Sequence, residues 1–252
     1  MTTVGTGLQT EGLVKRYGAL LVTDQVSLDI RAGELHAVIG PNGAGKTTLI
    51  NQLSGELRSD EGRITLAGHD VTALPVHERA RAGLLRSYQI TSIFEEFTVA
   101  ENAVLAALSA KRHAWRFWKP MLGDAEARGA ADAAVAAAGL TTLAAVPAGE
   151  LAYGQRRQLE LAMALAAQPK FLLLDEPMAG MSVQESTAVT ELLRELKGRY
   201  TILLVEHDMD AVFALADRIS VLVYGRVIFT GTPDEIREHP EVRAVYLGEE
   251  AV

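Results

Sequence analysis

The chain has 252 residues, of which 48% are hydrophobic and 22% are charged, as is typical of a globular protein with ample core material. Its formal net charge of −8 argues against a broad nucleic-acid-binding surface, so we expect no nucleic acid as a partner. The absence of cysteine excludes disulfides, thiolate catalysis and Cys-based metal sites. The polar N-terminus is unlike a signal peptide, and no apolar run reaches the length of a membrane-spanning helix, so a cytosolic protein is expected.

Two strands are predicted at the start of the chain. They cover residues 8–17 and 22–30, and a turn at Gly18 joins them. Apolar and polar residues alternate over 26–30, the period of a strand with one buried face. Tyr17 lies just before the turn, and on its own it favours edge packing over a functional role.

A glycine-rich loop follows a short apolar run at 35–39 and precedes a predicted helix that starts near residue 48. It matches the phosphate-binding pattern G-x-x-x-x-G-K-[ST]. Its residues are Gly40, Pro41, Asn42, Gly43, Ala44, Gly45, Lys46, Thr47 and Thr48. Such a loop aims backbone N–H groups and a helix dipole at an anion. We therefore predict nucleotide binding, with Lys46 reaching the β- and γ-phosphates and the Thr47 hydroxyl binding Mg²⁺.

The middle of the chain begins with a short strand at 62–68, a charged helix at 75–83 and a strand at 84–89 that ends in Gln89. Helices are predicted over 97–110 and over the alanine-rich segment 124–138.

The stretch between these two helices, residues 111–119, is basic and aromatic, and a surface loop is favoured there over a membrane contact. Gly139 ends the alanine-rich helix. The region from about 90 to 167 is therefore interpreted as a helical subdomain inserted into a sheet-bearing core.

An apolar run at 171–174 predicts a central parallel strand that is buried on both faces. Asp175 and Glu176 follow at its carboxyl end, the edge at which α/β sheets bind ligands. Together with the phosphate loop, the pair indicates a Mg²⁺-associated Asp followed by a candidate base.

The last third of the chain begins with a capping box at 182–185 that opens a helix. A buried strand at 201–205 ends shortly before His207, for which a structural and a functional role are equally open from this position alone. A hairpin around Gly225 and a short helix at 233–237 complete the chain.

With these motifs in place, the chain resembles an ATP-binding cassette (ABC) ATPase from about Leu8 to Gly248. Tyr17 matches the family's A-loop aromatic, Gln89 its Q-loop and His207 its switch histidine. The signature segment, LSGGQ in most members, reads here Leu151, Ala152, Tyr153, Gly154 and Gln155. The resemblance implies a P-loop NTPase fold, α/β in class, with an antiparallel β subdomain and the inserted helical subdomain. It makes residues 1–252 one nucleotide-binding domain, with a C-terminal extension at about 225–252.

The family's mechanism then implies roles for these residues, with ATP and Mg²⁺ as cofactors. Two cassettes would pair head to tail, and each ATP would lie between one phosphate loop and the signature segment of the other subunit. Glu176 would activate the attacking water, and His207 would contact the γ-phosphate. Asp175 would hold Mg²⁺, while Gln89 would sense it and relay to a membrane partner. Tyr17 would stack on adenine.

Two positions depart from the family's pattern. Ala152 replaces the usual signature Ser, which removes a hydroxyl contact to the γ-phosphate and leaves backbone groups and Gln155. Ser182 stands where the D-loop (residues 179–182) normally has Asp. The second departure puts the usual communication across the dimer in doubt, and it inclines us slightly toward pairing with a different cassette rather than with a second copy.

Finer features resemble the ATP-binding subunits of branched-chain amino-acid importers. They are the segment 86–89, the insert with Trp115 and Trp118, the LAYGQ signature and the tail at 246–249. Integral-membrane permeases and, indirectly, an extracytoplasmic binding protein would be partners, with the chain peripheral on the cytoplasmic face of the inner membrane. Urea or amide importers and the lipopolysaccharide exporter share parts of this pattern. A soluble ABC ATPase and a non-hydrolysing regulator are alternatives that the single cassette and the intact motifs disfavour.

Overall fold

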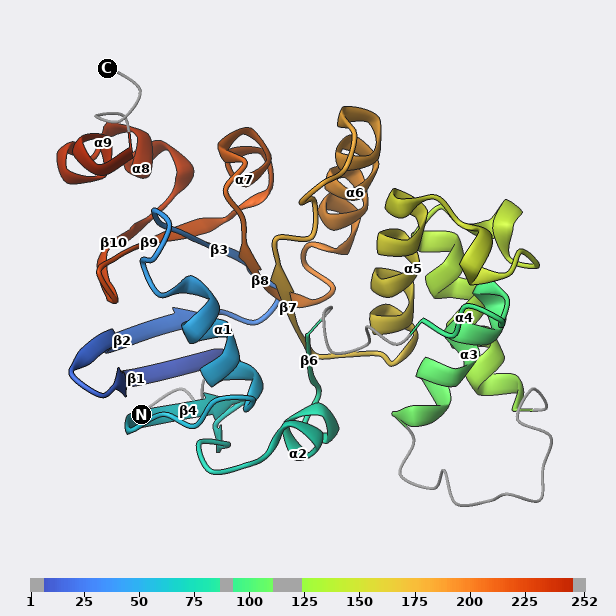
Figure 1. Ribbon diagram of the computed structural model, residues 1–252, viewed down its shortest axis with the longest axis horizontal. Coiled ribbons are helices and arrows are strands. Elements are labelled where there is room, and N and C mark those ends of the chain that lie inside the picture. Colours follow the sequence, from blue (N-terminus) through green and yellow to red (C-terminus); the bar gives the residue numbers. More distant parts are fainter. Residues whose placement is uncertain (1–6, 87–92, 111–123, 247–252) are drawn as a thin grey trace.

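The computed structural model describes residues 7–86, 93–110 and 124–246. Two sheets organise it (Figure 1). The smaller is four-stranded and antiparallel, in the order β2-β1-β4-β5. Its strands are β1 (Leu8–Tyr17), β2 (Leu20–Ile30), β4 (Glu61–Leu66) and β5 (His69–Asp70). This confirms the two predicted N-terminal strands.

The larger sheet has six strands in the order β10-β9-β3-β8-β7-β6. They are β3 (Leu35–Ile39), β6 (Leu84–Arg86), β7 (Phe171–Asp175), β8 (Thr201–Val205), β9 (Arg218–Val223) and β10 (Arg226–Gly231). All neighbours are parallel except β9 and β10, which form the predicted hairpin. The carboxyl ends of β3, β7 and β8 therefore meet at one edge, where the loops that follow them come together.

Helices cover the large sheet on both faces. Helix α1 (Lys46–Ser54) follows β3 and buries Leu49, Ile50 and Leu53 in a core that it shares with both sheets. Helices α6 (Val183–Leu196) and α7 (Met209–Leu215) belong to the core on the other face. The short helix α2 (Val76–Arg81) precedes β6. This layering is that of an α/β fold with a mixed large sheet.

A group of helices stands to one side of the sheets in Figure 1 and matches the predicted helical subdomain. It contains α3 (Val99–Ser109), α4 (Ala125–Ala137) and α5 (Tyr153–Ala166), with short 3₁₀ turns at Thr141–Leu143 and Ala148–Glu150. Alanines fill much of the space between these helices, because their small side chains let helices approach closely; buried examples are Ala103, Ala107, Ala131, Ala134 and Ala162.

The described part of the chain ends, at residue 246, with two helices where one was predicted. Helix α8 (Pro233–Glu238) agrees with the sequence, but α9 (Pro240–Tyr246) and the earlier α7 were not predicted. Each is seven residues long, too short for a clear helical period. The sequence signal that could have revealed α7 is its N-cap residue, Asp208. The Asp208 side chain accepts from the N–H of Ala211 at 3.1 Å.

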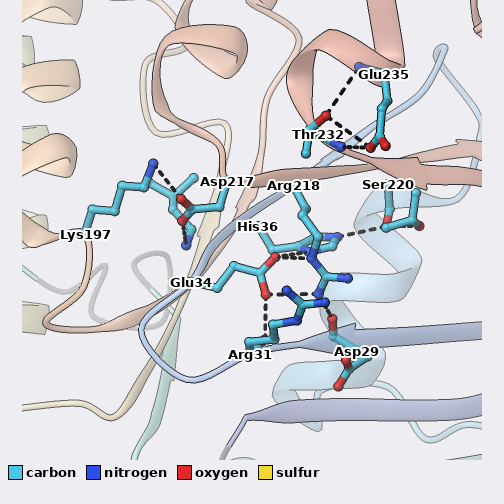
Figure 2. A network of polar contacts seen from close by, with 12 residues as sticks. Asp29, Arg31, Glu34, His36, Lys197, Asp217, Arg218, Ser220, Thr232 and Glu235 are labelled. Atoms are coloured by element: carbon cyan, nitrogen blue, oxygen red, sulfur yellow. Dashed lines mark hydrogen bonds and ion pairs between the residues drawn. The ribbon is translucent and has the colours of Figure 1, made fainter.

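A buried polar network joins the starts of β3 and β9 (Figure 2). His36 is fully buried; its Nδ1 lies 3.1 Å from Glu34 Oε1 and its Nε2 lies 2.8 Å from Ser220 Oγ. The Arg218 guanidinium donates to both oxygens of Glu34 and to the carbonyl of Asp29, which ties β9 to β2. The charges of Glu34 and Arg218 in this network therefore have partners, as buried charges require.

Candidate functional site

The phosphate loop lies between β3 and α1, in the context that the sequence predicts. The Lys46 ammonium donates to the carbonyl oxygens of Gly40 at 2.6 Å and Pro41 at 3.1 Å, so it folds back over the loop. Burial lowers the pKa of Lys46, while the nearby charges of Glu176 and Asp175 raise it. A cation with only carbonyl partners in the loop is well placed for a phosphate oxygen, which is a stronger acceptor.

Gly45 shows why this loop needs glycine. Its φ is +103°, and a Cβ at this position would lie 2.6 Å from the carbonyl oxygen of Val22 in β2. Both the left-handed backbone and the close approach of β2 exclude a side chain. The first N–H groups of α1, which have no partner within the helix, directly follow this glycine, and Thr47 is exposed.

Asp175 ends β7 and is held by Arg86, a cation for which the sequence alone indicated no role at this site. Arg86 Nη2 donates to Asp175 Oδ2 at 2.8 Å, and Arg86 Nη1 donates to Asn51 Oδ1 at 2.6 Å and to Glu56 Oε2 at 2.7 Å. Burial raises the pKa of Asp175, and the charge and hydrogen bond of Arg86 oppose that rise. Arg86 is itself almost completely buried, so it supports an ionised carboxylate at the end of β7.

Glu176 and His207 approach each other from the ends of β7 and β8. Glu176 Oε1 lies 4.0 Å from His207 Nδ1; the His207 side chain is exposed and that of Glu176 is half-buried. The backbone of Glu176 has a φ of +48°, and its N–H donates to the carbonyl of Val205 at 2.8 Å. A left-handed conformation at a non-glycine residue costs free energy, and such residues cluster at functional sites.

Glu206 was also missed, because an acidic residue beside an exposed histidine reads as part of a solvated loop. Its side chain is 1% exposed and accepts from the N–H groups of Met178 and His207, each at 3.0 Å. Burial raises the pKa of this carboxyl, and the two backbone donors oppose that rise. Glu206 thus anchors the backbone two residues after Glu176 and the backbone of His207 itself.

The signature segment begins α5, as expected, with Ala152 at the N-cap. Leu151 and Gly154 are buried, whereas Ala152 and Tyr153 are exposed. Gln155 Oε1 accepts from the Ala152 N–H at 3.0 Å. In Figure 1, α5 stands apart from α1 with the large sheet between them, so this segment and the phosphate loop lie at separate places on one chain.

The remaining predicted residues have different outcomes. Tyr17 ends β1, pairs in register with Leu20 of β2, and has a half-exposed ring. It therefore sits on the same strand pair as Val22, which touches the phosphate loop. Gln89 and the segment 111–119 lie outside the described residues.

The donor set suits Mg²⁺ better than a transition metal. Oxygen ligands are available from the Asp175 carboxylate and the Thr47 hydroxyl, and Mg²⁺ is commonly held by one or two such groups together with substrate phosphates. Within residues 7–86, 93–110 and 124–246, no group of three or more His, Cys, Asp or Glu is arranged to hold a metal by itself. The site therefore fits a metal that arrives with a nucleotide.

Comparison with known protein families agrees with this geometry. Residues 23–179 match the family model for the ABC transporter, and residues 226–252 match that for the branched-chain amino acid ATP-binding cassette transporter. The matches cover the phosphate loop, the Asp175–Glu176 pair and the C-terminal segment.

Two curated relatives span nearly the whole chain. The high-affinity branched-chain amino acid transport ATP-binding protein LivG of Salmonella typhimurium is 41% identical, covering 96% of this chain and 98% of the relative. BraF of Pseudomonas aeruginosa, described in the same words, is 38% identical and covers the same shares.

The fold is also found among solved structures. The ADP conformation of MJ1267, an ATP-binding cassette of an ABC transporter, has a TM-score of 0.83 and 31% identity, and the match covers 96% of this chain and 98% of that one. The family model covers more than half of the chain and the relatives cover nearly all of it. The chain therefore belongs to the ABC transporter family, as one of its ATP-hydrolysing ATP-binding cassettes.

Proposed function

We propose that this cassette energises the uptake of branched-chain or other hydrophobic amino acids through separate permease subunits. The chemistry is supported by the convergence of Lys46, Asp175, Glu176 and His207 at one edge of the parallel sheet. The class of cargo is supported by relatives named for branched-chain amino acid transport and by the matching C-terminal segment.

In this proposal, the phosphate loop and Lys46 bind the β- and γ-phosphates of ATP, and Tyr17 stacks on the adenine. Asp175 and Thr47 hold the Mg²⁺ that accompanies the nucleotide, and this ion neutralises phosphate charge. Gln89 senses the bound Mg²⁺. Positioning and charge neutralisation supply most of the catalysis in phosphoryl transfer.

Glu176 is proposed as the base that orients the attacking water. Its carboxylate lies at the end of β7 and beside His207, which is proposed to contact the γ-phosphate. The strained backbone of Glu176 and the two anchors of Glu206 hold this pair before the substrate arrives, so little reorganisation is needed during the reaction.

A second cassette completes the site. The signature segment stands away from the phosphate loop of its own chain, so we propose that Leu151, Ala152, Tyr153, Gly154 and Gln155 contact the ATP of a partner cassette, either a second copy or a related chain. None of the helices in the described part of the chain has the length and apolar character to span a bilayer. Permeases are therefore proposed to carry the substrate, with the cassette peripheral on the cytoplasmic face and an extracytoplasmic binding protein as an indirect partner.

The test is recovery of tagged Glu176→Gln protein from native membranes with ATP, followed by mass spectrometry. The variant is expected to lose hydrolysis and to keep ATP-dependent pairing, because it retains every phosphate-binding group. Polytopic permeases and a cassette partner should be recovered with it. Recovery of soluble ribosomal or DNA-associated proteins alone would contradict the transport proposal. Unchanged ATP turnover in the variant would show that Glu176 is not the base.

Urea or amide uptake and lipopolysaccharide export are the closest alternatives. A relative of 36% identity is the lipopolysaccharide export system ATP-binding protein LptB of Acidithiobacillus ferridurans, with 96% of this chain covered. The permeases recovered in the same experiment separate these cargoes, because the cargo is bound outside the cassette.

A further inference from the structure

The signature helix lacks a cap of its own. Ala152 occupies the N-cap of α5 and offers no side-chain acceptor to the first turn of the helix. The Gln155 side chain is turned back to the Ala152 N–H at 3.0 Å, so it does not serve the N–H groups that follow. The first N–H groups of a helix have no partner within the helix, so those of α5 need an acceptor from elsewhere.

Glu185, in the first turn of α6, lies at this place. Its Oε2 accepts from the Ser182 N–H at 2.9 Å and from the Ser182 hydroxyl at 2.8 Å, which completes the capping box of α6. Its Oε1 is turned toward Gly154, where a Cβ would lie 2.0 Å from it. Hydrogen bonds from the backbone and side chain of Ser182 lower the pKa of Glu185, and one from the Gly154 N–H adds to this.

A second contact joins the same two segments. The Tyr153 hydroxyl donates to the carbonyl of Ala179 at 3.4 Å. A Cβ at Gly180 would lie 3.4 Å from the edge of the Tyr153 ring, so the ring rests against the 179–180 backbone. Residues 152–155, at the start of the helix that precedes β7, and residues 179–182, which follow β7, therefore touch at two points.

We propose that Glu185 is a positioning residue that joins the signature segment to residues 179–182, so that both approach the partner's ATP as one body. One carboxylate lies at the N-termini of two helices, α5 and α6, and the dipoles of both favour its negative charge. Gly154 is required because the carboxylate occupies the space of a Cβ. The proposal rests on the proposed function, in which the signature segment contacts ATP across a pair of cassettes.

The test compares Glu176→Gln with Glu176→Gln/Glu185→Gln, both as full chains, for ATP-dependent dimerisation by light scattering. Glutamine keeps the shape of the side chain but replaces one carboxylate oxygen with an amide NH2 group, a donor that faces other donors. We expect about tenfold weaker dimerisation, because a charged acceptor shared by two helix ends is lost. The affinity of the monomer for a fluorescent ATP analogue should stay the same, because the phosphate loop is untouched.

Glu235→Gln is the matched control. Glu235 completes an equivalent capping box with Thr232 at the start of α8, where its Oε2 accepts from the Thr232 N–H at 2.7 Å. Dimerisation should be unchanged in that variant.

The outcomes separate the two proposals. Full dimerisation of the Glu185→Gln variant overturns the positioning role and leaves the proposed function intact. Loss of ATP-analogue binding in the Glu185→Gln variant also overturns it, since the effect then extends to the phosphate loop. If the Glu176→Gln parent does not dimerise with ATP, the proposed pairing itself fails.

Discussion

Arg86 Nη2 donates to Asp175 Oδ2 at 2.8 Å, which binds the end of β6 to the end of β7 at the edge of the sheet. The same guanidinium reaches Asn51 on α1 and Glu56 just beyond it. The carboxylate proposed to hold Mg²⁺ is thus oriented from the strand that leads into the segment containing Gln89. The side chains of Arg86 and Asp175 are only 5% and 15% exposed, so this ion pair is sheltered from water.

Arg86→Met should therefore destabilise the free cassette. Removing one partner of a buried ion pair leaves the other charge uncompensated, and we expect a loss of about 3 kcal/mol in the free energy of unfolding. Urea denaturation without nucleotide measures it. Arg86→Met/Asp175→Asn should recover part of the loss, because the orphaned charge is gone. A loss below about 1 kcal/mol would mean that the pair behaves like a surface ion pair.

The network around Glu34 predicts a pH dependence. Burial by itself raises the pKa of Glu34, but hydrogen bonds from His36, Arg218 and the Arg31 N–H outweigh it and hold the pKa at about 2, below the ordinary 4.5. A depressed pKa in the folded state stabilises the fold above pH 4.5, and this contribution is lost as the pH falls toward 2. Its full size is about 3 kcal/mol.

Glu34→Gln tests this dependence by urea denaturation at a series of pH values. The difference in unfolding free energy between the original chain and the variant should be largest at neutral pH and should shrink below pH 4.5. Glu11→Gln, which changes an exposed carboxylate on β1, serves as the control. A difference that stays constant down to pH 3, an acidity within this window, would mean that the contribution of Glu34 is packing rather than charge.

Ala152→Ser should be tolerated. The backbone of Ala152 already has the extended conformation of an N-cap, and a hydroxyl there can accept from the first turn of α5. We expect a gain of about 0.5–1 kcal/mol in the free energy of unfolding, measured by thermal or urea denaturation. ATP turnover should change less than about threefold, since backbone groups dominate anion binding at a helix N-terminus. A large loss of turnover would show that the site depends on the small residue.

The predictions of strands and helices depended on periodicity and capping, and they were most accurate where those signals are strong. Strand β7 was predicted from its unbroken apolar run, and α6 from the capping box of Ser182 and Glu185. Helices α7 and α9 were missed because seven residues hold too few turns to show a period. The phosphate loop could be read directly, because its chemistry lies in one contiguous stretch.

The sequence by itself determined the nucleotide-binding loop, the α/β class and the order of the motifs, because each depends on residues that are neighbours in the chain. Only the tertiary structure decided which distant side chains meet. Arg86 reaches Asp175 across β6 and β7, Glu206 anchors the backbone of Met178, and Glu185 reaches Gly154. Such contacts are set by strand order and helix packing, which bring together groups that no local pattern relates.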